Sequence, residues 1–256
     1  FNAANINSYE MSNIAVAPSF QPDYDNSRTF NLWTAKFQLE YRPTNDLLLY
    51  AGVNRGVKAG NYNSSFTFSP ADVISEDEMG YKPETLLSFE GGFKLTQGPL
   101  LLNASAFYYD YNDYQAFVFN TGSGVVRNVD AKVYGLDIDA SLRVSDALRL
   151  GANFGWSHAR IKDFAIAPGV FRTVRPPYSP EYQATGTLDY TVPGEIMGGS
   201  VSFNTTVNYA GAIYHNIRNF DAHRFGGRTL VNLSATWENK DKGLSFTVFG
   251  KNVFDE

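Results

Sequence analysis

The chain contains 256 residues, 43% of them hydrophobic and 18% charged, and its formal net charge at pH 7 is -5. The absence of cysteine excludes a disulfide framework, a thiolate metal site and a cysteine nucleophile, and without a basic excess no nucleic-acid partner is expected. No apolar run approaches the ~20 residues that a transmembrane helix needs, so no helical span is predicted.

Apolar and polar residues alternate in segment after segment, which predicts about ten β-strands. The clearest case is VYGLDIDASLRV at residues 133–144. Successive side chains of a strand point to opposite faces, so each such segment has one apolar face and one polar face. The predicted strands cover residues 27–42, 47–58, 84–96, 101–117, 132–144, 148–161, 182–192, 199–210, 228–238 and 244–254.

The connections between these strands alternate between short and long. The short ones are the turns PTND, QGPL, SDA, PGEIMG and KDKG, and the long ones are centred on residues 61–80, 120–128, 165–180 and 214–227. Loops longer than ~12–15 residues are uncommon in compact domains and often have a function. Short turns at one end and long loops at the other are typical of outer-membrane barrels, whose short turns are periplasmic.

Alternation alone leaves open whether the apolar face lies in a soluble core or against lipid. Aromatic side chains near the strand ends favour lipid, because amphipathic rings concentrate at membrane–water interfaces. These side chains are Trp33, Tyr41, Trp156, Tyr190, Tyr209 and Trp237. We therefore predict an all-β fold: an antiparallel, up-and-down transmembrane β-barrel with short periplasmic turns and long extracellular loops.

The barrel prediction assigns particular residues to each face of the sheet. The convex, lipid-facing set includes Leu136, Ile138, Leu150, Phe154, Phe203 and Leu233, and the concave set includes Asp137, Asp139, Asn153, Asn204 and Asn232. Both ends of the chain are predicted on the long-loop side, whereas single-chain barrels have an even number of strands and close on the other side. We therefore expect residues 1–256 to be a partial barrel domain that lacks strands on both sides.

Six segments in this order resemble TonB-dependent outer-membrane receptors. They are LLLYAGVNRGVKAGNYN (47–63), YKPETLLSFEGGFK (81–94), LLNASAFYYDYNDYQ (101–115), NVDAKVYGLDIDASLRVSDALRLGANFGW (128–156), PPYSPEYQATGTLDY (176–190) and RTLVNLSATWENKDKGLSFTVFGKNVFDE (228–256). The resemblance implies a barrel of about 22 strands whose lumen is filled by an N-terminal plug domain. We expect the plug, the early barrel strands and the final strand to lie outside this sequence.

The same resemblance implies a receptor, not an enzyme, in the outer membrane of a Gram-negative bacterium. Such receptors import scarce ligands, namely ferric siderophores, haem, cobalamin or sugars, with energy from TonB. We expect a ferric siderophore as the ligand, outer-membrane lipid as the surroundings, and the TonB complex as a partner reached through the plug. The alternatives are a passive outer-membrane porin and a soluble carbohydrate-binding β-sandwich.

No phosphate loop, nucleophile elbow or HExxH motif is present, and the histidines lack metal-ligand spacing, so no catalytic residue, metal or cofactor is predicted. Cations and flat rings in the long segments suit an anionic, aromatic iron chelate, although rings also stack on sugars and a plain solvated surface competes with both. The candidate ligand-binding residues are Arg127, Arg172, Arg175, Tyr214, His215, Arg218, Phe220, His223, Arg224 and Phe225. The candidate lumen-facing residues, which would contact a plug, are Glu40, Glu90, Lys94, Asp137, Asp139 and Asn153.

Overall fold

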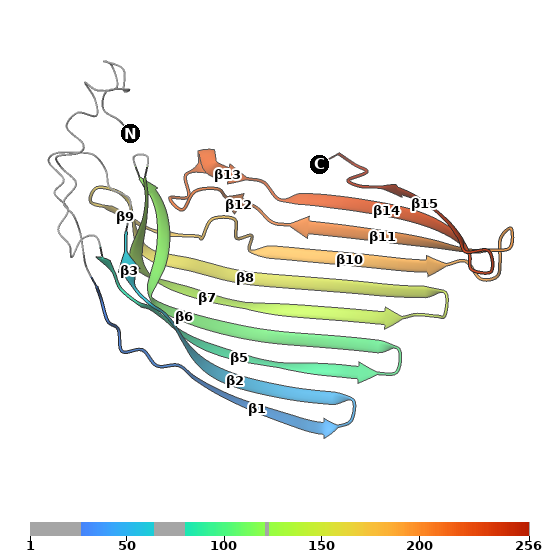
Figure 1. Cartoon of the computed structure of the whole chain (residues 1–256), viewed down its shortest axis with the longest axis horizontal. Helices are drawn as coiled ribbons and strands as arrows, with labels where there is room; N and C mark the ends of the chain where they lie inside the picture. The colour runs from blue at the N-terminus through green and yellow to red at the C-terminus, as the bar shows by residue number, and fades with distance from the viewer. Residues whose placement is uncertain (1–26, 64–79, 121–122, 256) are drawn as a thin grey trace, which may run out of the picture.

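The computed structural model describes residues 27–63, 80–120 and 123–255, and ten strands of this part follow one another in a single antiparallel sheet (Figure 1). Each strand pairs with its neighbours in the order β1-β2-β5-β6-β7-β8-β10-β11-β14-β15. Their bounds are β1 (Ala35–Thr44), β2 (Leu47–Lys58), β5 (Glu84–Gln97), β6 (Leu100–Asn120), β7 (Ser123–Arg143), β8 (Leu148–Ala167), β10 (Tyr182–Thr191), β11 (Ser200–Ala210), β14 (Arg228–Asn239) and β15 (Leu244–Gly250). The predicted antiparallel meander is confirmed.

The two ends of the sheet differ, as the connection lengths predict. The short turns lie at the right of Figure 1, and the short elements lie at the opposite end. These elements are β3 (Asn61–Tyr62) paired with β4 (Gly80–Tyr81), β9 (Val170–Val174) paired with β8, β12 (Ile213–Tyr214) paired with β13 (Arg224–Phe225), and the 3-10 helix η3 (Asp221–His223). Throughout the described ranges, no helix has the length and apolar character needed to cross a membrane.

Turn chemistry explains why the short connections are tight. The β5–β6 turn consists of two residues, and Gly98 adopts a φ of 56°, which glycine tolerates without a Cβ clash. At the β7–β8 turn the Ser145 hydroxyl accepts hydrogen bonds from the N–H groups of Ala147 (3.2 Å) and Leu148 (3.1 Å). The Leu148 N–H also donates to the Ser145 carbonyl (3.3 Å), so side-chain and backbone bonds together close the turn.

The prediction that residues 120–128 form a loop is wrong, because most of these residues belong to β6 or β7. Val125 and Val126 are β-branched and continue the β6–β7 ladder opposite Val118 and Phe117. A register shift between Tyr111 and Tyr114 allows the ladder to continue past this point. Residues 64–79, which make up most of the predicted loop at 61–80, lie outside the described residues.

The extended β6–β7 hairpin is braced by the chain that enters and leaves the β2–β5 connection. The Gln115 side chain is buried and donates to the carbonyl oxygens of Ala59 (2.8 Å) and Lys82 (3.2 Å). Its own N–H donates to Glu84 Oε2 (2.8 Å), and Asn128 donates to the Lys82 carbonyl (3.0 Å). This polar network therefore holds the extended hairpin to the residues on either side of the β2–β5 connection.

The first and last strands are also shorter than predicted. β1 begins at Ala35 instead of residue 27, and β15 ends at Gly250 instead of residue 254. After Gly250 the chain turns back, because the N–H of Asn252 donates to Asn232 Oδ1 and the N–H of Val253 donates to the Val231 carbonyl, both at 3.0 Å. These bonds to β14 replace further pairing along β15.

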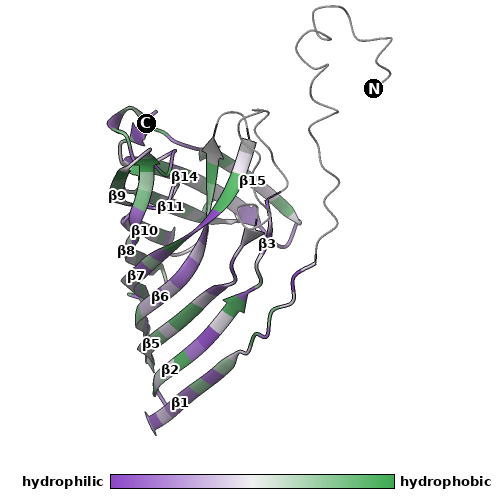
Figure 2. Ribbon diagram, turned by 90° about the vertical axis from the view of Figure 1, so that its left-hand side faces the viewer, coloured by the Kyte–Doolittle hydropathy of each residue, from purple (hydrophilic) through white to green (hydrophobic). Residues whose placement is uncertain are grey.

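The pairing register places apolar residues of successive strands on one face and polar residues on the other. Leu150 of β8 lies opposite Leu142 of β7 and Leu188 of β10, whereas Asn153 lies opposite Asp139. The registers confirm the predicted grouping of both residue sets, and the alternation appears as bands along the strands in Figure 2. Leu150 is 37% exposed and Leu233 is 43% exposed.

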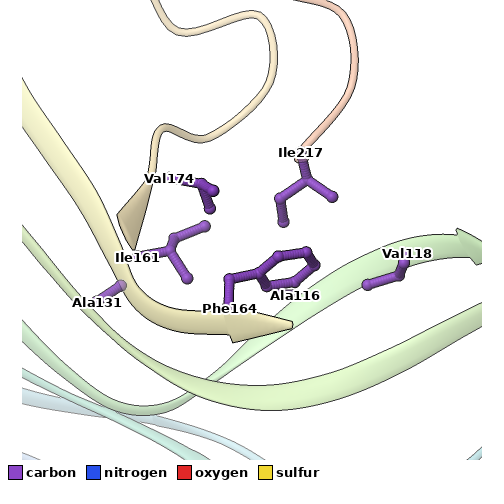
Figure 3. Close-up of a cluster of buried hydrophobic side chains, with 7 residues drawn as sticks. All are labelled: Ala116, Val118, Ala131, Ile161, Phe164, Val174 and Ile217. Carbon is purple, nitrogen blue, oxygen red and sulfur yellow. The ribbon is translucent and has the colours of Figure 1, made fainter. Parts of the chain in front are cut away.

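No second sheet covers the apolar face within the described residues, since the two further sheets are two-stranded. The described residues therefore lack the second layer that the soluble β-sandwich alternative requires. The buried apolar cluster instead lies at the long-loop end (Figure 3) and consists of Ala116, Val118, Ala131, Ile161, Phe164, Val174 and Ile217. It includes Ala131 and Ile161 from the polar-face side of β7 and β8, so the loop that contains Ile217 folds toward the polar face.

Candidate functional site

The polar face presents a network of carboxylates, amides and hydroxyls across β1–β8. Asp139 accepts hydrogen bonds from Asn103 (3.3 Å) and from Asn153, which lie on the two strands that flank β7. Tyr50 donates to Glu90 Oε1 at 3.2 Å. Each carboxylate is thus held by side chains of neighbouring strands, and both oxygen atoms of Asp139 accept such a bond.

A hollow of about 550 Å³ opens on this face between β1 and β6. Its lining includes Lys36, Tyr50, Glu90, Lys94 and Tyr109, all from the polar-face positions of their strands. The sheet therefore curves toward its polar face. Six predicted lumen-facing residues share that face, namely Glu40, Glu90, Lys94, Asp137, Asp139 and Asn153.

At the long-loop end, an exposed stack of three rings joins two connections that are distant in sequence. His215 stacks on Phe225 with a centroid separation of 3.8 Å and an interplanar angle of 19°, and Tyr178 packs against His215 at 4.9 Å. The β12–β13 pairing brings His215 and Phe225 together, and the Tyr178 N–H donates to the Tyr214 carbonyl (2.9 Å). Tyr178 is 65% exposed and Phe225 51% exposed, so the stack presents ring surface to solvent.

Arg175 and Asn219 hold these two connections to each other. The Arg175 guanidinium donates to the carbonyl oxygens of Ser179 (3.1 Å) and Ala212 (2.9 Å) and lies 5.6 Å from the Tyr214 ring centroid. The Asn219 side chain accepts from the Arg175 N–H (2.6 Å) and donates to the Arg175 carbonyl (3.0 Å). We call Arg175 and Asn219 the loop clasp. Its hydrogen bonds hold Arg175 to other residues of this chain.

The other four predicted arginines remain available. Arg172 lies in β9, Arg218 follows Ile217, and Arg224 begins β13. Arg127 lies in β7 and not in a loop, because the β6–β7 ladder continues through it. Within the described part of the chain, none of these four guanidinium groups has a carboxylate partner.

The remaining predicted residues divide between two ring contacts. The ring centroids of Phe220 and His223 lie 6.1 Å apart. The His223 carbonyl accepts a hydrogen bond from the His215 N–H (2.9 Å). The Nδ1 atom of His223 is buried and has no hydrogen-bond partner among the described groups. Among all the residues that the structure describes, no three or more His, Cys, Asp or Glu side chains form a group that could hold a metal ion.

Two residues of this region were missed by sequence reasoning. Tyr178 follows two prolines in RPPY and adopts a φ of 55°, and Asn219 adopts a φ of 53°, a conformation that asparagine tolerates better than most residues. The double proline indicates a rigid bend, but nothing in the sequence indicates which ring the bend presents. The partner of Asn219 lies 44 residues away and could not be read from local spacing.

Glu181 forms an ion-pair cluster just before β10. Its Oε1 atom lies 2.6 Å from Arg160 Nη2 and 3.6 Å from His158 Nδ1. Burial alone would raise the pKa of the Glu181 carboxyl, but the hydrogen bond and positive charge of Arg160 outweigh it, so the pKa lies below its ordinary value. Glu181 and Arg160 therefore form an ion pair at neutral pH, which fixes the entry to β10.

Residues 8–253 match the family described as TonB dependent receptor-like, beta-barrel. The chain belongs to the TonB-dependent receptor family. Members of this family are transport receptors of the Gram-negative outer membrane and are not enzymes. The ten described strands are therefore a portion of a transmembrane β-barrel, which agrees with the unlayered apolar face.

Solved structures of TonB-dependent receptors resemble this fold. The ferric yersiniabactin uptake receptor FyuA from Yersinia pestis has a TM-score of 0.69 and 20% identity, with 86% of this chain and 32% of that chain covered. The ferric preacinetobactin receptor BauA from Acinetobacter baumannii has a TM-score of 0.66 and 16% identity, covering 87% and 32%. The copper transporter OprC has a TM-score of 0.65 and 18% identity, with 86% of this chain and 33% of that chain covered. The chain thus spans about a third of the length of these structures.

Proposed function

We propose that this chain forms part of the barrel of an outer-membrane receptor that binds a ferric siderophore and imports it with energy from TonB. The observation that supports this most directly is the long-loop end, which carries the exposed ring stack together with the segments that contain Arg172, Arg218 and Arg224. Arginine forks suit carboxylate or catecholate oxygens, and flat rings stack on aromatic chelators. The ligand would enter between the loops and the polar face.

The local charge supports an anionic ligand although the chain as a whole is acidic. The formal net charge is -5, yet Arg172, Arg218 and Arg224 lie without carboxylate partners in the described part of the chain. A cation without a carboxylate partner attracts an anion over roughly a Debye length, which is ~8 Å at physiological ionic strength. The similar structures include receptors that are named for ferric ligands.

The polar face would form the lumen wall in this proposal. Its carboxylates and amides are fixed by bonds between strands, as Asp139 shows, and they present a polar surface to a plug domain. The plug, the remaining barrel strands and the contact with TonB would be supplied by the rest of the receptor. A passive porin would share the polar lumen but would need neither plug nor energy.

The test replaces the three free loop arginines in the complete receptor by R172A, R218A and R224A together. Arg175 is left intact because its guanidinium bonds to backbone carbonyls and its loss would disturb the loops. We expect the dissociation constant for an anionic ferric siderophore to rise by at least about tenfold, since a hydrogen bond to a charged group contributes about 1.5–3 kcal/mol. The residual binding should also depend less on salt.

The matched control is the double variant R143A/R149A, which removes two cations at the short-turn end of β7 and β8. It should leave siderophore binding unchanged. Unchanged iron uptake in the triple variant, together with growth that depends on a sugar, would overturn the siderophore assignment. Uptake that persists after the proton gradient is collapsed would favour the porin.

A further inference from the structure

The apolar face ends, toward the long loops, in one row of charged side chains. Arg55 of β2 lies opposite Leu87, Leu87 opposite Asp110, Asp110 opposite Lys132, and Lys132 opposite Arg160. These pairings form a continuous line across five neighbouring strands. Only Leu87 is apolar, so the apolar pattern of the face stops at this line, which we call the charged row.

Aromatic rings occupy the next row toward the short turns. Phe89 lies opposite Tyr108, Tyr108 opposite Tyr134, and Tyr134 opposite His158. Tyr134 also stacks on His158 at 4.8 Å and meets Trp156 edge-on at 5.8 Å. Amphipathic rings favour the level between hydrocarbon and water, so this row marks the interface.

The charges of the row are anchored but not fully compensated. Lys132 Nζ lies 3.6 Å from Asp110 Oδ2 and donates to the Tyr108 hydroxyl (3.0 Å). Arg160 pairs with Glu181 at 2.6 Å. Arg55 donates to the Trp33 carbonyl and stacks 4.0 Å from the Trp33 ring centroid. No carboxylate of the described residues pairs with Arg55, so three cations of the row meet two carboxylates.

We propose that the charged row binds the phosphate head groups of anionic lipids whose acyl chains lie along the apolar face. The order from apolar rows through rings to cations follows the order of an amphiphile from acyl chain to phosphate. Each guanidinium group has five N–H donors, so Arg55 and Arg160 keep donors for phosphate oxygens beyond their bonds to Trp33, Ala159 and Glu181, and Lys132 offers a point charge. A small soluble anion would leave the adjoining apolar rows uncovered, which is why we assign the site to lipid.

This inference rests on the membrane placement proposed above but not on the identity of the imported ligand. The complete receptor is reconstituted in nanodiscs that contain phosphatidylcholine and phosphatidylglycerol, and native mass spectrometry measures the lipids that stay bound on release. We expect wild type to retain phosphatidylglycerol in preference. The triple variant R55Q/K132Q/R160Q should reduce that preference at least about fivefold, the effect of one basic residue near an anionic surface.

Two further variants separate charge from folding. K58Q/R143Q/R149Q removes three cations from the same strands on the polar face and should keep the preference. The charge-conserving R55K/R160K should retain most of it. Equal loss in both triple variants, or abolition by inorganic phosphate at constant ionic strength, would overturn the inference. A receptor that fails to insert would overturn the membrane placement as well, whereas insertion without lipid preference would overturn this inference alone.

Discussion

Asn219 shows how one amide determines the shape of the candidate site. Its oxygen accepts from Arg175, and its nitrogen donates to the carbonyl oxygens of Arg175, Asn216 and Ile217. The residue is 9% exposed, so these bonds form largely away from water. Because Ile217 belongs to the buried cluster, the clasp also connects the ring stack to the sheet.

We predict that Asn219→Gly loosens the two loops without a backbone penalty, since glycine accepts the φ of 53°. Loss of the side-chain bonds costs about 1–3 kcal/mol, so the amide protons of Arg175 and Tyr178 should exchange at least about fivefold faster. Hydrogen–deuterium exchange of the complete receptor measures this. Asn219→Ala adds backbone strain and should exchange faster still; exchange at the wild-type rate in both variants would refute the clasp.

Glu181 gives a pH dependence whose sign follows from its lowered pKa. The ionised carboxyl is favoured in the folded chain, so its stabilisation is complete above the ordinary pKa of 4.5 and is lost as pH falls through the lower folded value. We predict that acidification below 4.5 lowers the unfolding temperature of the detergent-solubilised receptor more in wild type than in Glu181→Gln. Parallel pH profiles would show that the ion pair with Arg160 contributes nothing.

At the scale of elements, strand positions could be predicted closely because alternation at period two is a strong local signal. The β2 bounds agree at both ends, and β5, β10, β11 and β14 each differ from prediction by a single residue at one end. The β6–β7 extension was missed because the pair of glycines at 122 and 124 suggested a loop. Its Val125–Val126 pair was the available counter-signal, and the β2–β5 connection supplies the support that spacing alone does not show.

Glycines within strands provide a test of packing at this scale. A Cβ at Gly92 of β5 would collide with the Ala104 carbonyl oxygen and lie 2.8 Å from the Tyr50 hydroxyl, whereas a Cβ at Gly186 of β10 would meet nothing within 4 Å. We predict that Gly92→Ala destabilises the reconstituted receptor by about 1–3 kcal/mol. Gly186→Ala should be neutral or stabilising by up to about 1 kcal/mol. Equal free energies of unfolding in denaturant would contradict the close approach of β5 to β6 at Gly92.

At the scale of the whole molecule, the sequence predicts the sheet and its two faces but not how the loops close over one of them. Periodicity shows that Asp139 and Asn153 share a face, yet it cannot show that Arg175 bonds to Ala212, because that contact depends on the path of two long connections. The candidate arginines were therefore identified by residue type alone. Only the fold shows that the Arg175 guanidinium is bonded to backbone carbonyl oxygens, whereas the other candidate arginines have no carboxylate partner among the described residues. The placement of the strands in the membrane follows from the assignment of the apolar face to lipid and the polar face to the lumen.

The assignment of the faces is the central claim, and site-directed spin labelling tests it most directly. This chain contains no cysteine, so single cysteines can be placed from Leu148 to Ser157 along β8 of the receptor in lipid vesicles. We predict that oxygen, which partitions into lipid, relaxes labels at Leu150 and Phe154 most, and that a water-soluble nickel complex relaxes labels at Gly151 and Asn153 most. The two profiles should alternate at period two in opposite phase. Profiles in phase, or a nickel maximum at Leu150 and Phe154, would contradict the barrel.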